Sequence, residues 1–116
     1  MNKINLEFTS EQAGVLIPFF NNDLHFIYEW ASLINESVDY KEAKFLEDCI
    51  ILLRDGQMMN LDVVLEAPIQ FKNTLIRLTS NIALTREKVL SPKEYDTYDD
   101  IIEVFTEGYK KFDVEV

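Results

Sequence analysis

The fold depends most on residues 61–90, LDVVLEAPIQFKNTLIRLTSNIALTREKVL. Apolar residues recur there at steps of three and four for most of the length, which predicts a helix rather than a strand. A second apolar stripe widens the face, as in the central helix of a bundle. Pro68 is expected to kink or split this helix, and strands at 63–65 and 75–78 are the alternative. The two stripes are Leu61, Val64, Pro68, Phe71, Leu75, Leu78, Ile82 and Val89, and Ile69, Ile76, Ala83 and Leu90.

Clear start and stop signals indicate helices on both sides of this stretch. Residues 91–94, SPKE, place Ser at the N-cap, Pro at N1 and Glu at N3, and predict a helix to about Lys111. Upstream, Asp39 is expected to start a helix that ends at Gly56, because glycine readily takes the left-handed conformation that closes a helix.

The region before residue 39 is interpreted as two helices. Thr9 and Gln12 resemble a capping box, which predicts a short helix to about residue 17. Pro18 is expected to end or kink that helix, because proline lacks the N–H that a helix interior needs. A second helix then runs from Asn21 or Asn22 to about residue 35.

Both ends of the chain alternate between apolar and polar residues. Residues 3–8, KINLEF, and residues 112–116, FDVEV, each predict a half-buried strand. We expect these strands to pair and to pack on a helix, because an isolated pair is only marginally stable. The sequence therefore predicts a mainly α fold in one domain over residues 1–116. It would be a four- or five-helix bundle with a small two-stranded β pair formed by the N- and C-termini.

The composition excludes several classes of protein. Of 116 residues, 21 are acidic and 11 basic, a formal net charge of −10, which disfavours a domain that binds nucleic-acid phosphates. Hydrophobic residues, at 47%, are too many for a disordered acidic chain, and a single cysteine excludes an intramolecular disulfide. Without a signal peptide or about 20 consecutive apolar residues, we expect a cytoplasmic protein. The Lys, Ile and Asn bias is typical of a low-GC bacterium or its phage.

The negative charge is concentrated at the two ends of the chain. Residues 1–40 hold one lysine and six acidic residues, and residues 91–116 hold three basic and eight acidic residues. Residues 41–90 are balanced, with seven of each sign. If the termini pair, the two acidic segments lie side by side and form one negative face.

The final helix carries an acidic stripe beside tyrosines. Its acidic residues recur at steps of four, three and four, so they share one helical face, and only Glu107 has a basic residue, Lys111, one turn further on. Tyrosine beside carboxylate suits an interface with a basic partner, whereas a solvated face with tyrosines in the core is the alternative. The predicted partner-binding residues are Tyr95, Asp96, Tyr98, Asp99, Asp100, Glu103 and Glu107, with Tyr109 also beside the stripe.

The other chemistry-bearing residues favour structural roles. His25 and Glu29 lie one turn apart, but the chain has a single histidine, so a surface ion pair is a better interpretation than a metal site. Cys49 lies on an apolar stripe after two acidic residues, which favours a buried thiol over a nucleophile. The three glycines are isolated, so no phosphate-binding loop is predicted. We expect no catalytic residue, no cofactor and no metal.

Phe26, Trp30 and Leu33 lie together, off the main stripe of their helix. They either pack in the core, which we favour, or leave an apolar patch for a partner. Burial of Trp30 or Phe26 between two copies would support a self-associating protein.

Two functions from different classes fit this profile. The first is an acidic protein-binding module, not an enzyme, that inhibits or neutralises a basic partner such as a nuclease toxin or a nucleic-acid-binding protein. It would bind neither nucleic acid nor membrane, and its acidic face would steer association. Immunity proteins, antitoxins and phage anti-defence inhibitors share this general profile. The alternative is a self-associating structural or regulatory protein, a possible homodimer, whose charge serves solubility.

Overall fold

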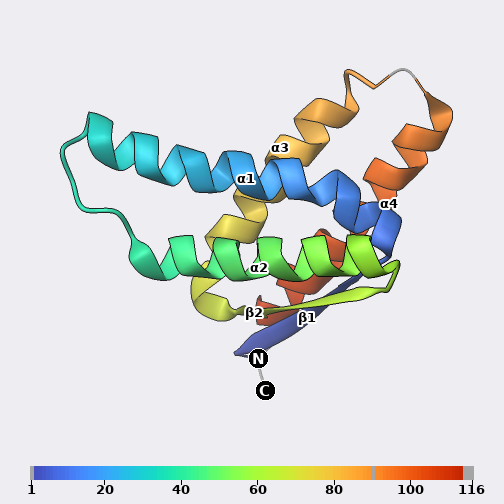
Figure 1. Ribbon diagram of the computed structural model, residues 1–116, viewed down its shortest axis with the longest axis horizontal. Helices are drawn as coiled ribbons and strands as arrows, with labels where there is room; N and C mark the ends of the chain where they lie inside the picture. The colour runs from blue at the N-terminus through green and yellow to red at the C-terminus, as the bar shows by residue number, and fades with distance from the viewer. Residues whose placement is uncertain (1, 90, 114–116) are drawn as a thin grey trace.

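The computed structural model describes residues 2–89 and 91–113. Within these residues the chain forms four α-helices, one antiparallel pair of strands and two short 3₁₀ helices, so the predicted mainly helical fold is confirmed. Figure 1 shows α1 and α2 side by side, with the strands beneath α2 and with α3 crossing behind α1. The elements are β1 (Lys3–Phe8), α1 (Ser10–Leu33), α2 (Tyr40–Met59), β2 (Val63–Pro68), η1 (Ile69–Phe71), α3 (Lys72–Arg86), α4 (Pro92–Lys110) and η2 (Lys111–Asp113).

The N-terminal strand is confirmed, but its predicted partner is wrong. β1 pairs with β2 from the middle of the chain, with Ile4 opposite Ala67 and Phe8 opposite Val63. Alternate residues of both strands are buried, which is the pattern of a sheet with one face on the core. Residues 111–113 form η2 instead of a strand, and the remaining predicted strand residues, 114–116, lie outside the described residues.

Residues 61–90 do not form one helix. They form β2, then the turn of η1, and only then α3. The alternative of a strand at 63–65 is therefore confirmed, whereas residues 75–78 are helical. The three-and-four spacing through Val64 was misleading, because the buried residues here are Val63, Leu65 and Ala67, at a period of two.

α1 continues through Pro18, which contradicts the predicted break and the predicted start at Asn21 or Asn22. The predicted capping box is present, because Thr9 Oγ1 accepts from Gln12 N at 3.1 Å and Gln12 Oε1 accepts from Thr9 N at 2.9 Å. Pro18 lies on the exposed side of the helix. The buried residues before and after Pro18 stay in phase along one face, and their burial outweighs the roughly 3 kcal/mol that an interior proline costs. These residues are Ala13, Leu16, Phe20, Asp23 and Ala31.

α2 begins as predicted but ends later. The Asp39 side chain accepts from the backbone of Lys41 and Glu42 and so caps the helix. The helix runs past Gly56 to Met59, and Asn60 at φ 55° supplies the left-handed closure that was expected of Gly56. The predicted stop at Gly56 is therefore wrong, because this glycine is needed for close packing.

α4 begins and ends close to the predicted residues. Pro92 occupies its first turn, and the backbone carbonyl of Ser91 accepts from Tyr95 N at 3.1 Å. The Ser91 side chain makes no capping hydrogen bond. Proline in the first turn thus marks this helix start. The N–H groups of a first turn have no partner within the helix, so proline loses no hydrogen bond there.

Two glycines let helices approach the buried face of the sheet. A Cβ on Gly56 of α2 would lie 2.1 Å from Val63 Cγ2, and a Cβ on Gly108 of α4 would lie 2.3 Å from Leu6 Cδ2. α2 therefore packs on β2, and α4 packs on β1, while α1 and α3 pack against α2 and α4 respectively. None of the helices in the described residues is long and apolar enough to span a bilayer.

Candidate functional site

The acidic stripe of α4 is present and faces solvent. The side chains of Asp96, Asp100, Glu103 and Glu107 are all exposed. They project from the side of α4 opposite its buried residues Ile101, Phe105 and Gly108. None of the four carboxylates forms an ion pair or a side-chain hydrogen bond with another residue in the part of the chain that the structure describes, and this includes Glu107 with Lys111.

Asp99, at the border of the stripe, has an intramolecular partner. Arg86 at the end of α3 donates to both of its carboxylate oxygens, with an Nη2–Oδ2 distance of 3.1 Å. The same guanidinium lies over the ring of Tyr95, 5.0 Å from its centroid. Arg86 therefore neutralises Asp99 at the border of the stripe and occupies one face of Tyr95.

The other tyrosines of α4 contribute to the core. Tyr98 is half-buried, and its ring meets Phe19 of α1 edge-on at 6.1 Å. Tyr109 is also half-buried against the core. Among the predicted partner-binding residues, the structure thus brings four free carboxylates together and ties Tyr95, Tyr98 and Asp99 to other elements.

The two acidic ends of the chain meet, although not by strand pairing. Glu7 of β1 and Glu107 of α4 line one open cavity of about 830 Å³. Lys3 and Lys111 line it as well, and Lys3 bonds Glu66 of β2 at 2.8 Å. The carboxylates beside the sheet therefore share this cavity with two lysines, whereas the stripe of α4 carries unpaired carboxylates among the described residues.

A second exposed surface, which we call the α1 patch, consists of Phe26, Trp30 and Leu33. These side chains are 47%, 52% and 79% exposed, so the expectation that they pack in the core is wrong. The rings of Phe26 and Trp30 stack at 6.1 Å. They project because the C-terminal half of α1 buries only Asp23 and Ala31.

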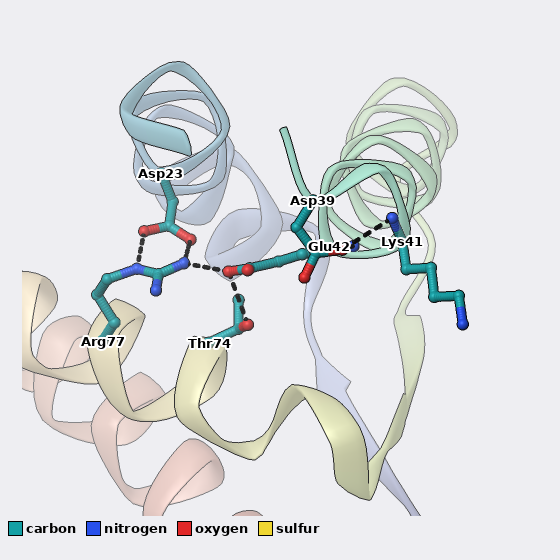
Figure 2. A network of polar contacts seen from close by, with 6 residues as sticks. All are labelled: Asp23, Asp39, Lys41, Glu42, Thr74 and Arg77. Atoms are coloured by element: carbon teal, nitrogen blue, oxygen red, sulfur yellow. Dashed lines mark hydrogen bonds and ion pairs between the residues drawn. The ribbon is translucent and has the colours of Figure 1, made fainter. Parts of the chain in front are cut away.

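A polar network joins α1, α2 and α3 (Figure 2). Arg77 of α3 donates to both oxygens of Asp23 on α1, at 2.6 and 2.8 Å, and also to Glu42 of α2. Thr74 adds a hydrogen bond to Glu42 at 3.0 Å. The hydrogen bonds to Asp23 raise the pKa of the Arg77 guanidinium, which therefore stays charged.

Sequence reasoning missed this network, although one signal was present. Asp23 is only 1% exposed and lies in phase with the buried stripe of α1. A charged residue at a core position needs a partner, but its partner Arg77 is 54 residues away. Arg77 also lies over the ring of Phe26, at 5.8 Å, so the network supports one edge of the α1 patch.

His25 and Cys49 lie where the sequence predicts them, on the surface beside Glu29 and in the core. His25 Nε2 lies 2.9 Å from Glu29 on the exposed side of α1. Cys49 is buried, and burial, with a contribution from Asp48, raises its pKa to about 12, which makes it a poor nucleophile. In the described residues, no group of three or more His, Cys, Asp or Glu side chains is placed to hold a metal ion.

We found no protein-family model, curated protein or solved structure that matches this chain.

Proposed function

We propose that this chain is a non-catalytic, cytoplasmic protein-binding module that inhibits or neutralises a basic protein acting on nucleic acid. The supporting observation is the stripe of α4, where Asp96, Asp100, Glu103 and Glu107 are exposed and unpaired among the described residues. Like charges at this spacing destabilise a helix by a few tenths of a kcal/mol per pair. Four unpaired carboxylates on one face are therefore better explained by a partner than by helix stability.

The mechanism would be electrostatic. Carboxylates along one helix face attract a surface built to hold phosphates and accelerate its association. Once bound, the helix would occupy that surface and exclude nucleic acid from it. Asp99 contributes less to this attraction, because Arg86 already neutralises it.

The proposal is tested by reversing charge within the stripe. The double variant Asp100→Lys and Glu103→Lys is compared with Glu47→Lys and Asp55→Lys, which makes the same change at exposed positions on α2. Both are mixed at low salt with each basic protein encoded beside the gene, and association rates are measured by surface plasmon resonance. We expect the α4 variant to associate at least about tenfold more slowly, and the α2 variant to stay within about threefold of wild type.

Melting temperatures of both variants should stay close to wild type, because all four positions are exposed. Equal association rates for the two variants would show that bulk charge, rather than the stripe, determines binding. Tight binding that does not respond to salt would contradict the electrostatic mechanism.

A second candidate function is self-association through the α1 patch, with the charge serving solubility. The observation that favours it is the exposure of Phe26 and Trp30, because stacked aromatic rings in water are typical of a surface that a partner covers. This candidate requires two copies to bury Trp30, and it makes no use of the stripe on α4.

A further inference from the structure

β2 has an edge whose backbone groups point away from β1. Ile69 N donates to Asn2 O at 2.8 Å, and this pair continues the register of the two strands. Opposed residues of an antiparallel pair alternate between exchanging hydrogen bonds and pointing their backbone groups outward. The N–H and C=O groups of Val64 and Glu66 therefore point to the free edge, as does the C=O of Pro68.

The position of Pro68 agrees with this assignment. Proline has no N–H to donate, so within a sheet it is confined to edge positions whose N–H would face outward. Nothing in the described residues pairs with this edge of the sheet. Instead, an open cavity of about 570 Å³ runs along it, lined on the strand side by Val64, Glu66 and Pro68.

The two helices on the buried face of the sheet contact different strands. α2 contacts β2 at Gly56, and α4 contacts β1 at Gly108. Helices pack about 8–10 Å apart, whereas neighbouring strands lie only about 4.8 Å apart. A helix is thus wider than the strand on which it packs, and β2 is an edge strand within the described residues. The cavity beside β2 lies between the free edge of this strand and α2.

Apolar side chains form the floor of this cavity. Phe45, Cys49 and Leu52 come from α2, and Phe71 comes from η1. The rings of Phe45 and Phe71 stack at 4.3 Å, while Leu52 is 47% exposed. Alternate side chains of a strand added to β2 would point to the same face as Leu65, toward α2. Apolar residues at those positions would cover Leu52.

The cavity is also lined by charged side chains, two lysines and two carboxylates. Lys41 lines it and, together with Phe71, lines the neighbouring cavity, which places this lysine at the η1 end. Lys44 pairs with Asp48 at 3.4 Å, whereas Lys41 forms no ion pair within residues 2–89 and 91–113. In a chain with a net charge of −10, an exposed lysine beside an apolar floor complements an acidic side chain.

We propose that the groove between α2 and β2 binds an extended peptide segment of another protein, which adds to β2 as a third strand. The segment would carry apolar residues at alternate positions and an acidic residue beside Lys41. A second copy of this chain fits less well, because both copies would carry a net charge of −10 and repel each other. This site lies on α2 and β2, so it is separate from the proposed role of the α4 stripe.

The first test uses a random peptide library displayed on phage and selected on the full chain. We expect the selected peptides to alternate apolar and polar residues and to share an acidic end. Binding of the synthesised consensus peptide is then measured by calorimetry for wild type and for Val64→Pro, which removes an outward N–H without breaking the ladder to β1. We expect the Kd of the peptide for Val64→Pro to be at least about tenfold higher than for wild type.

Asn5→Pro is the matched control, because Asn5 holds the equivalent outward position on β1. Its Kd should stay within about twofold of wild type. If circular dichroism shows that Val64→Pro does not fold, peptide binding by Leu52→Glu becomes the deciding measurement. Leu84→Glu is then the control, because Leu84 is exposed on α3. Leu52→Glu should weaken binding about tenfold and Leu84→Glu should not.

N-methylation of the peptide gives an independent readout. Methyl groups on alternate amides should abolish binding only when those amides face Val64 and Glu66. Failure to select any peptide, or equal binding by wild type, Val64→Pro and Leu52→Glu, would overturn the proposal. A dimer of the chain that dissociates on Val64→Pro would overturn it in favour of a second copy in the groove.

Discussion

Arg77 makes the buried charge of Asp23 compatible with the core. A carboxylate that is only 1% exposed has lost nearly all contact with water, and the two-pronged hydrogen bond from Arg77 replaces that hydration. Removing one member of such a pair leaves the other buried without compensation. The two buried charges are thus tolerated as a pair, whereas deletion of either side chain is strongly unfavourable.

We expect Arg77→Met to lower the free energy of unfolding by about 3–5 kcal/mol, and Arg77→Met with Asp23→Leu to lower it by much less. Urea denaturation at pH 7 measures both. Lys44→Met is the control, because the exposed Lys44–Asp48 pair should contribute about 0–1 kcal/mol. A double variant as unstable as Arg77→Met would show that loss of the network's hydrogen bonds, rather than the uncompensated charge, lowers the free energy of unfolding.

At the scale of the element, two glycines show the difference between the helix propensity of a residue and the space that packing leaves for it. Gly14 and Gly56 both lie inside helices, where glycine is about 1 kcal/mol less favourable than alanine. The neighbour of Gly56 is the buried, β-branched side chain of Val63, which cannot move aside easily. The neighbour of Gly14 is the end of the flexible, exposed Gln57 side chain.

Alanine should therefore have opposite effects at these two positions. We expect Gly56→Ala to destabilise the protein by about 1–3 kcal/mol, because the added methyl group overpacks the contact between α2 and β2. Gly14→Ala should be neutral or stabilise it by up to about 1 kcal/mol. Thermal melts of the two variants provide the comparison, and stabilisation by Gly56→Ala would contradict the close packing of α2 on β2.

The elements also show where local signals are sufficient. Thr9 with Gln12, Asp39, and Pro92 each mark the true start of a helix, because capping and a first-turn proline depend only on residues within one turn. Pro18 and Gly56 gave misleading stop signals. Their local cost is outweighed by contacts with residues far along the chain, which no local pattern contains.

At the scale of the whole molecule, charge and exposed apolar surface oppose each other. A net charge of −10 repels a second copy at low salt, whereas Phe26 and Trp30 favour one. The acidic charge therefore favours a monomer and the α1 patch favours a dimer. Salt distinguishes the two effects, because it screens the charge repulsion.

If binding to a basic partner is the function, we expect light scattering to show a monomer at both low and high salt. Trp30 is the only tryptophan, so its fluorescence reports directly on the α1 patch. Its emission should stay at long wavelength over a wide range of protein concentration. A dimer that persists in high salt with Trp30 emission at shorter wavelength would favour self-association, and Trp30→Ala with Phe26→Ala should then restore the monomer.

By itself, the sequence determined the helical class, the N-terminal strand, the starts of α1, α2 and α4, and the acidic stripe of α4. These depend on periodicity and on contacts within a turn or two, which are written in adjacent residues. Only the tertiary structure decided that β1 pairs with β2, that Asp23 meets Arg77, and that Phe26 and Trp30 stay exposed. Each of these depends on which distant surfaces bury one another. The period-two residues of β2 were masked by a helical spacing, and only packing against β1 and α2 distinguishes the two patterns.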